Sequence, residues 1–238
     1  MSLLDWLALP LSGASEHQLP AWAAWHARSM VLAWAVLLPL GALLARYFKV
    51  MPGQRWPDVL DNPRWWHGHR ALQWAGVLLM TLGLVLILDH GSATTALAQG
   101  HRLAGWLAFL LGWFQVASGL LRGSKGGPTA PAWRGDHYDM SPQRRWFERL
   151  HKSLGWLAVL LAWGTTLLGL KLVDAPRWMP LLLGLWWLGL VLLAWQLQRH
   201  GRSIDTYQAI WGPDPSHPGN RMKPIGWGVN RPKTRLRP

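Results

Sequence analysis

Half of the 238 residues are hydrophobic and 15% are charged, whereas about a quarter of the residues in soluble domains are usually charged. The absence of cysteine excludes disulfides, thiolate metal sites, iron–sulfur clusters and cofactors attached by thioether bonds. The net charge of +13 comes mostly from basic residues between apolar runs and in the C-terminal segment. Membrane orientation and anionic lipid explain such charges more simply than nucleic acid does, so we expect no nucleic-acid binding.

Five windows of the sequence contain no Asp, Glu, Lys or Arg. They hold 17, 18, 19, 18 and 21 residues and lie between Arg28 and Arg46, Arg70 and Asp89, Arg102 and Arg122, Lys152 and Lys171, and Arg177 and Arg199. A helix needs roughly 20 residues to cross the hydrocarbon core of a bilayer. A soluble bundle would need a polar face on each helix, and these windows offer none. The predicted fold class is therefore an all-α integral membrane protein with five transmembrane helices.

Capping residues, prolines and polar loops separate the predicted elements from one another. Residues 1–20 are too short and too polar to span a membrane and lack the positive start of a signal peptide, so we predict an N-terminal interfacial segment. The helices are expected at about residues 21–49, 62–89, 101–122, 141–170 and 177–198. Asn62-Pro63 and Ser141-Pro142 each combine a capping residue with a first-turn proline, and Pro39 predicts a kink in the first helix. Residues 200–238 form a basic tail rich in proline and glycine, and its Trp211 and Trp227 predict that it is partly ordered against the membrane face.

The distribution of basic residues predicts the orientation of the chain. Arginine and lysine are concentrated in the first–second and third–fourth connections and in the tail. The positive-inside rule therefore places the N-terminus outside and the C-terminus in the cytoplasm. Arginine outnumbers lysine three to one, which is typical of GC-rich bacteria, so we expect a bacterial inner membrane.

One stretch of the sequence occurs twice. Residues 101–113 read HRLAGWLAFLLGW, and residues 151–163 read HKSLGWLAVLLAW. Each copy has glycine four residues after its histidine, at Gly105 and Gly155, and residues so spaced share a helix face. The glycines leave space in which a flat, bulky group could press against the backbone beside the imidazole. A histidine near the start of a predicted helix occurs four times, at His26, His69, His101 and His151.

The alternating directions of consecutive helices sort these histidines into two pairs. His26 and His101 fall at the outer face, and His69 and His151 fall at the inner face. If the first four helices form an up-and-down bundle, each pair lies on diagonal helices roughly 11–14 Å apart. That separation suits a metal held between two imidazoles, as in a bis-histidine haem, whereas zinc requires three or four ligands at one point. The alternative is that each histidine only forms hydrogen bonds at the membrane interface.

A basic residue follows each of these histidines within two positions: Arg28, Arg70, Arg102 and Lys152. These side chains would neutralise the anionic propionates of a haem, or they simply extend to the lipid headgroups. His67 shares the start of its helix with His69 and is an alternative ligand there. The remaining histidines are expected at an interface or in solvent: His17, His90, His137, His200 and His217.

Residues 26–170 resemble the cytochrome b561 family, especially its DOMON-linked members. The resemblance rests on four features: the first helix, HARSMVLAWAVLLPLGALLARYF; Trp65 and Gln73 around His69; the His101 helix ending at Leu121-Arg122; and Trp146 and Gly155 around His151. It implies two b-type haems, ligated by His26 with His101 and by His69 with His151, and it favours His69 over His67. The family typically passes electrons across a membrane, often from ascorbate to monodehydroascorbate or ferric iron.

The function we expect is transmembrane electron transfer by a di-haem cytochrome domain over residues 21–199, with residues 200–238 as a cytoplasmic tail. Expected partners are membrane lipid and a donor or acceptor such as ascorbate, quinol, a ferric chelate or a redox protein, and a homodimer is compatible with the sequence. Two alternatives remain open. The chain could be a cytochrome b subunit between quinone and a partner dehydrogenase, or a non-redox transporter or scaffold whose histidines bind protons or metal ions.

Overall fold

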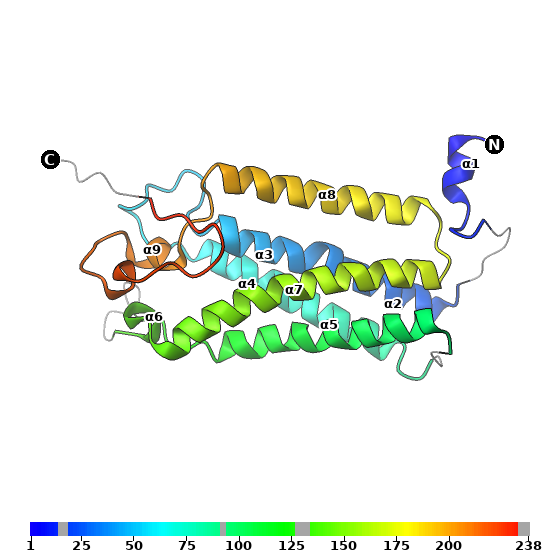
Figure 1. Cartoon of the computed structure of the whole chain (residues 1–238), viewed down its shortest axis with the longest axis horizontal. Coiled ribbons are helices and arrows are strands. Elements are labelled where there is room, and N and C mark those ends of the chain that lie inside the picture. Colours follow the sequence, from blue (N-terminus) through cyan, green and yellow to red (C-terminus); the bar gives the residue numbers. More distant parts are fainter. Residues whose placement is uncertain (14–18, 91–93, 127–133, 233–238) are drawn as a thin grey trace. The chain divides into compact units, whose positions relative to one another are not determined.

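The computed structural model describes residues 1–13, 19–90, 94–126 and 134–232, which form helices and isolated β-bridges but no strand. The first long helix consists of α2 (Ala21–Val31), the π-helix η1 (Leu32–Leu37) and α3 (Leu38–Tyr47). The other long helices are α4 (Arg64–Val85), α5 (Ala96–Leu120), α7 (Pro142–Leu172) and α8 (Trp178–Arg199) (Figure 1). The short ones are α1 (Leu3–Ala8), α6 (Asp136–Asp139), α9 (Thr206–Trp211) and the 3-10 helix η2 (Pro218–Arg221).

Within the described part of the chain, four helices are long and apolar enough to cross a membrane. They are Ala21–Tyr47, Ala96–Leu120, Pro142–Leu172 and Trp178–Arg199. The prediction of an all-helical integral membrane protein is confirmed at this level. Helix α4 is 22 residues long but is not in this set, so the fifth span stays a prediction.

Side-chain caps begin three of the long helices. Asn62 Oδ1 accepts a hydrogen bond from the backbone N–H of Arg64, and Ser141 Oγ accepts one from that of Arg144, as the two cap-plus-proline patterns predict. Helix α5 begins at Ala96, earlier than the loop expected up to Gly100. The Thr95 hydroxyl caps it by accepting from the N–H of Ala98, so the helix gains its first turn before His101.

The first helix accommodates Pro39 through its π-helical segment. The Leu38 N–H bonds to the Ala33 carbonyl, and Pro39 has no N–H, so the carbonyls of Trp34 and Ala35 need other donors. Indole groups supply them: Trp163 Nε1 donates to Trp34 O at 3.2 Å, and Trp186 Nε1 donates to Ala35 O at 2.7 Å. Satisfied carbonyls are essential where no water is present to replace the lost bond. Where the sequence predicts a kink, the structure therefore has a π-helix that is hydrogen-bonded to side chains of α7 and α8.

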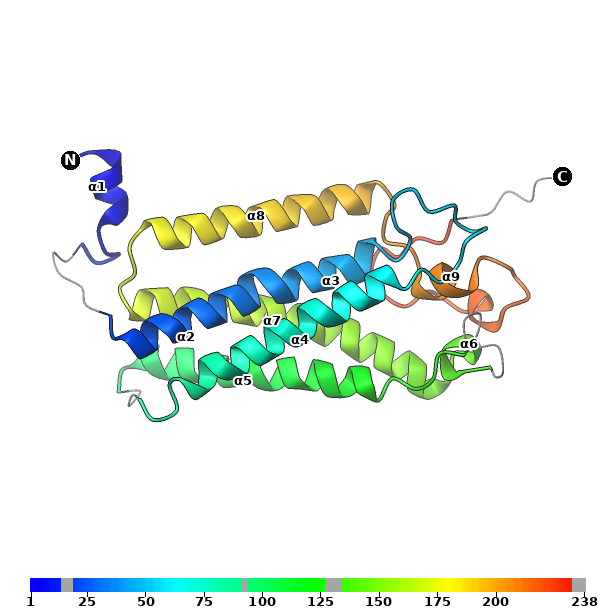
Figure 2. The same ribbon diagram turned by 180° about the vertical axis from the view of Figure 1, so that it is seen from behind.

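The chain divides into two compact units. Unit 1 contains Met1–Pro39, Leu72–Trp113 and Leu157–Leu193, and unit 2 contains Leu40–Ala71, Phe114–Trp156 and Ala194–Pro238. Within unit 1, α4 and α5 lie side by side, where Trp113 Nε1 donates to Thr81 Oγ1 at 3.2 Å (Figure 2). The segment after α1 is joined to the start of α8 by two backbone hydrogen bonds, Leu11 N to Ala175 O and Arg177 N to Leu9 O. His26 and His101 belong to unit 1.

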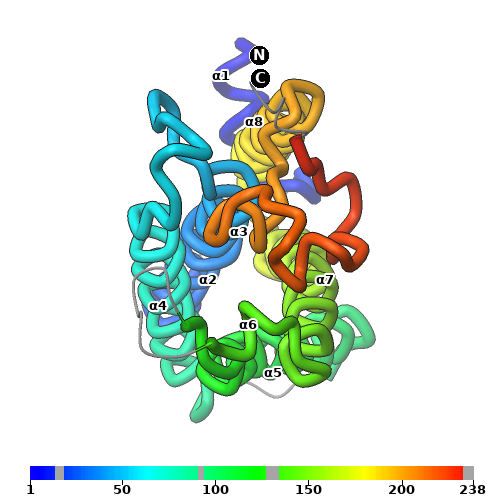
Figure 3. The backbone as a smooth tube through the Cα atoms, turned by 90° about the vertical axis from the view of Figure 1, so that its left-hand side faces the viewer, coloured from blue at the N-terminus to red at the C-terminus, as the bar shows by residue number. Residues whose placement is uncertain are grey.

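Unit 2 contains His69, His151 and a folded C-terminal segment. Within it, α9 packs against α6 and η2 (Figure 3). All six residues of α9 are buried. Tyr207, Ile210 and Trp211 form a hydrophobic cluster with Trp65, Met140 and Ile225. The tail predicted from its proline, glycine and arginine content is therefore ordered over the residues that the structure describes.

Candidate functional site: two histidine pairs

His26 on α2 and His101 on α5 face each other in unit 1. Their ring centroids are 6.3 Å apart, and the ring planes are inclined by 82°. His26 Nδ1 lies 2.8 Å from the Gly83 carbonyl, and His101 Nδ1 lies 3.0 Å from the Thr165 carbonyl. Each Nδ1 must donate to its carbonyl, so each ring presents an unprotonated Nε2.

His69 on α4 and His151 on α7 form an equivalent pair in unit 2. Their ring centroids are 6.4 Å apart with an interplanar angle of 76°. His69 Nδ1 lies 2.9 Å from the Gly41 carbonyl. His151 Nδ1 lies 3.0 Å from Ser118 Oγ, and the Ser118 hydroxyl donates its proton to the Gln115 carbonyl. The side-chain amide of Gln115 lies 2.9 Å from the same Nδ1, so Ser118 and Gln115 together hold the ring. Within the described residues, Nε2 of His151 forms no hydrogen bond.

These distances fit two imidazoles on opposite sides of one metal ion. A metal–imidazole bond is about 2 Å long and the ring centre lies about 1.2 Å behind the nitrogen, so the two ring centres are expected about 6.4 Å apart. Hydrogen bonds from the second ring nitrogen to carbonyls are typical of ligating histidines, because they fix the tautomer and the ring orientation. Among the residues that the structure describes, no group of three or more His, Cys, Asp or Glu side chains could hold a metal ion. A pair of histidines would hold an iron ion whose other ligands a macrocycle such as haem would supply.

Glycines border both pairs. A Cβ added to Gly105 or Gly155 would be in ordinary van der Waals contact with one neighbouring side chain, with closest atoms at 3.9 and 3.5 Å, so the expected space for a flat, bulky group stays a prediction. A Cβ on Gly169 would lie 2.9 Å from His101 Cε1. The sequence analysis missed Gly169, because its approach to His101 is a contact between α7 and α5 that no local pattern reveals.

The four basic neighbours differ in their surroundings. Lys152 Nζ donates to Glu148 Oε2 at 2.6 Å and to the Ile225 carbonyl at 2.8 Å, so protein groups already satisfy it. Arg28 stacks over Trp25 at 5.0 Å, and Arg70 lies 5.8 Å from the Trp66 ring. Arg102 is exposed. Within the described residues, the three arginines take part in no ion pair.

Arg122, which the sequence analysis named only as the end of the His101 helix, lies over the Trp66 indole. Its guanidinium is 4.1 Å from the Trp66 ring, and that ring is 6.0 Å from the His69 ring. Burial and the nearby cations Arg144 and Arg70 lower the pKa of Arg122. Arg70 and Arg122 thus both lie over the Trp66 ring beside the His69–His151 pair, an arrangement that favours the binding of an anion.

The other histidines take different positions. His67 is exposed, so His69 and not His67 lies opposite His151. His90 stacks on Trp22 with ring centroids 4.9 Å apart. His200 is exposed and His217 is partly buried, whereas His17 lies outside the described residues. The expectation that His137 faces solvent is wrong: His137 is completely buried.

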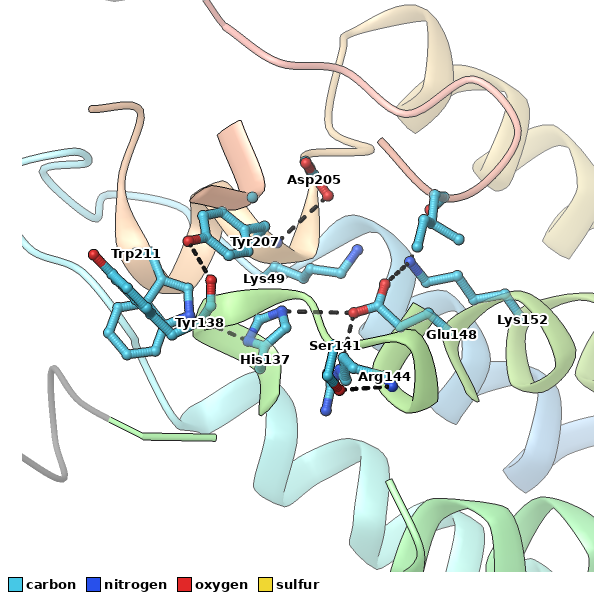
Figure 4. A network of polar contacts seen from close by, with 12 residues as sticks. Lys49, His137, Tyr138, Ser141, Arg144, Glu148, Lys152, Asp205, Tyr207 and Trp211 are labelled. Carbon is cyan, nitrogen blue, oxygen red and sulfur yellow. Dashed lines mark hydrogen bonds and ion pairs between the residues drawn. The ribbon is translucent and has the colours of Figure 1, made fainter. Parts of the chain in front are cut away.

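His137 belongs to a buried polar network in unit 2 (Figure 4). Its Nδ1 accepts from Trp211 Nε1 at 3.3 Å, and its Nε2 is 3.5 Å from Glu148 Oε1. Burial first, and the Arg144 cation second, lower the pKa of His137 to about 3. Glu148 also binds Arg144 at 3.1 Å and Lys152 at 2.6 Å. Nε2 forms no hydrogen bond within the described residues, so the Trp211 indole is the only hydrogen-bond partner of the neutral ring there. Trp211 and Glu148 approach His137 from other elements, which a polar local sequence does not reveal.

The structure defines the class: an all-helical membrane protein in which two pairs of histidines lie close together. Comparison with known proteins finds relatives of one kind. Two cytochrome b561 and DOMON domain-containing proteins of Arabidopsis thaliana are 30% identical over 119 residues and 28% identical over 114 residues, each covering 48% of this chain. A cytochrome b561, DM13 and DOMON domain-containing protein of the same plant is 31% identical over 100 residues, or 42% of this chain.

These matches establish a relationship to the cytochrome b561 family. The chain spans only 23%, 26% and 10% of the length of these three relatives. No family model matches, and no solved structure shows a significant match.

Proposed function

We propose that this chain is a five-span membrane cytochrome that transfers electrons across the bilayer through two b-type haems. His26 and His101 ligate one haem, and His69 and His151 ligate the other. The observation that carries the proposal is the geometry of the pairs: ring centroids 6.3 and 6.4 Å apart, with every Nδ1 in a hydrogen bond. The relationship to cytochrome b561 proteins supports the same cofactor.

The chain's own residues supply ligation, orientation and exclusion of water. A bound haem would supply a one-electron ferric/ferrous couple. The carbonyls of Gly83, Gly41 and Thr165 orient three of the imidazoles, and Ser118 orients the fourth. These hydrogen bonds also raise the basicity of the ligands, which favours the ferric state and lowers the midpoint potential.

Arg28, Arg70, Arg102 and Lys152 are proposed to compensate the propionate charges. The unpaired state of the three arginines supports this role for them, and Arg122 joins Arg70 at the His69–His151 pair. Lys152 contributes its charge there even though its ammonium group already has protein partners. Charge compensation of this kind stabilises the reduced haem and raises its potential.

In the proposed topology the His26–His101 haem lies near the outer face and the His69–His151 haem near the cytoplasmic face of a bacterial inner membrane. At 1.5 Å per residue, the 22-residue α4 is about 33 Å long and is therefore long enough for the fifth span. The donor and acceptor are proposed to be small redox molecules such as ascorbate, quinol or a ferric chelate.

The test is a dithionite-reduced visible spectrum of the purified protein with haem quantification, followed by a redox titration. We expect two b-type haems per chain and two one-electron steps. Because the imidazole planes of each pair are nearly perpendicular, both ferric haems should give strongly anisotropic low-spin EPR signals. Reduction by ascorbate and by quinol, compared in the same preparation, identifies the donor class. A colourless protein would refute the proposal and favour a non-redox transporter or scaffold.

A further inference from the structure

The C-terminal segment Arg202–Pro232, here called the C-terminal cap, is held together by its own polar contacts. Asn230 N–H donates to Ser203 O at 2.7 Å, and Asp205 N–H donates to Asn230 O at 2.9 Å, so the two ends of the cap pair with each other. Arg231 Nε binds Asp205 Oδ2 at 2.5 Å. The same guanidinium donates to the carbonyls of three residues in the middle of the cap: Gly219, Asn220 and Met222. This partly buried ion pair, together with the hydrogen bonds around it, therefore closes the segment into one folded piece.

The cap packs against the beginning of α4. Trp65, four residues before His69, is 9% exposed and lies in one cluster with Tyr207, Ile210, Trp211 and Ile225 of the cap. Neighbouring Trp66 packs partly on the same cluster and lies 6.0 Å from the His69 ring. Residues four apart lie on one face of a helix, so a surface that fixes Trp65 also fixes the direction of His69.

The cap also holds the beginning of α7. Trp211 Nε1 donates to His137, which faces Glu148 three residues before His151. Lys152, directly after His151, donates both to Glu148 and to the Ile225 carbonyl of the cap. Figure 4 shows Glu148 between the ring of His137 and the ammonium group of Lys152. The two helices that carry the second histidine pair are thus each bound to the same cap.

We propose that the C-terminal cap is a positioning element for the His69–His151 haem site and not for the His26–His101 site. This inference rests on the proposed haem ligation. Tertiary contacts from one folded segment set the directions of α4 and α7 at the points where their histidines project. A bis-imidazole site tolerates little displacement, because both nitrogens must reach the same metal ion within about 0.2 Å of the ideal bond length. Cap and cofactor therefore stabilise each other.

A substitution at Gly219 tests this proposal, because it alters the cap without changing any residue of α4 or α7. A Cβ at Gly219 would overlap the ring of Tyr207, which is 1% exposed and donates its hydroxyl to the Tyr138 carbonyl at 2.8 Å. Gly219→Ala therefore displaces α9 from α6. The matched control is Gly184→Ala on α8, where an added Cβ meets nothing within 4 Å. Both variants are made in the full chain and purified in detergent without added haem.

We expect Gly219→Ala to lower haem content from two per chain to one, or to convert one haem to high spin, while Gly184→Ala keeps two low-spin haems. Double variants that combine Gly219→Ala with a histidine substitution identify the affected site. Adding His69→Ala to Gly219→Ala should remove no further haem, whereas adding His26→Ala should remove the last one. A chain shortened after His200 is the second variant and should retain only the haem that depends on His26.

Two low-spin haems with unchanged potentials in both Gly219→Ala and the shortened chain would overturn the inference. Loss of both haems from a Gly219→Ala protein that still inserts into the membrane and stays soluble in detergent would also overturn the inference. The cap would then support the whole bundle and not one site. If wild-type protein binds no haem, the proposed function itself fails. The wild-type spectrum alone therefore tells failure of the proposed function from failure of the cap inference.

Discussion

Gly169→Ala is expected to disturb one haem site by the addition of a single methyl group. The new Cβ would lie 2.9 Å from His101 Cε1 and 3.4 Å from His101 Nδ1. Carbon atoms in favourable contact are about 3.5–4.0 Å apart, so the imidazole must move by about 0.6 Å or more, or α7 must retreat. Either movement stretches the hydrogen bond from His101 to the Thr165 carbonyl or displaces Nε2 from the position opposite His26.

The magnitude follows from the usual cost of overpacking. An inserted methyl group in a packed interior costs about 1–3 kcal/mol, which corresponds to about a 5- to 150-fold weaker haem affinity at the His26–His101 pair. Alanine in place of glycine within a helix favours the helix by about 1 kcal/mol. That gain applies to folding and does not restore the ligand geometry. The second pair, in the other unit, is expected to be unaffected.

Haem dissociation measured by transfer to apomyoglobin, together with the visible spectrum, is the assay. Gly164→Ala is the matched control, because it is on the same helix and an added Cβ there meets nothing within 4 Å. We expect Gly164→Ala to retain both haems and Gly169→Ala to lose one several-fold faster. Equal dissociation rates and identical low-spin spectra in the two variants would refute the reasoning about His101.

Three further predictions concern charge, pH and topology. Arg28→Gln and Arg102→Gln should each lower the midpoint potential of the His26–His101 haem by about 60 mV, or about 1.4 kcal/mol for one electron, and unchanged potentials in a redox titration would leave only a role at the headgroups. His137 has a pKa of about 3 when folded and an ordinary value near 6.5 when unfolded. As pH falls below 6.5, His137 binds a proton when it is exposed by unfolding of the cap but not when the cap is folded over it, so the stability of the folded cap should fall by up to about 1.4 kcal/mol per pH unit until about pH 3. Cleavage of the cap by an acid-active protease should therefore increase as pH falls, and it should increase less steeply in His137→Asn than in the wild type. Equal pH profiles of cleavage in the two proteins would contradict this prediction. A reporter active only in the cytoplasm should work at the C-terminus and fail in the connection at residues 94–100, and the reverse pattern would overturn the orientation.

The sequence alone predicts which histidines lie close together, because charge-free windows and alternating helix directions constrain them strongly, whereas their role as ligands stays a prediction. The structure brings His26 to His101 and His69 to His151, the pairs that alternation predicts. It also agrees with the cap-plus-proline starts at residues 62–63 and 141–142. These features depend on local chemistry, which a sequence records directly.

The missed features all depend on contacts between distant segments. Arg122 lies 56 residues after Trp66 in the chain, and only the packing of the helices stacks one on the other. The C-terminal cap is rich in proline, glycine and arginine, a composition typical of loops, yet Arg231 and Asp205 join its ends. His137 lies in a polar stretch, and Trp211 and Glu148 bury it by approaching from other elements.

Haem content of single histidine variants tests the pairing most directly. His26→Ala and His101→Ala should each bind one haem per chain with the same remaining spectrum and potential. His69→Ala and His151→Ala should each bind the other haem, and the double variant His26→Ala with His69→Ala should bind none. The exposed His67 supplies the control, since His67→Ala should keep both haems. Different remaining haems in His26→Ala and His101→Ala, or full low-spin content in His151→Ala, would contradict the account.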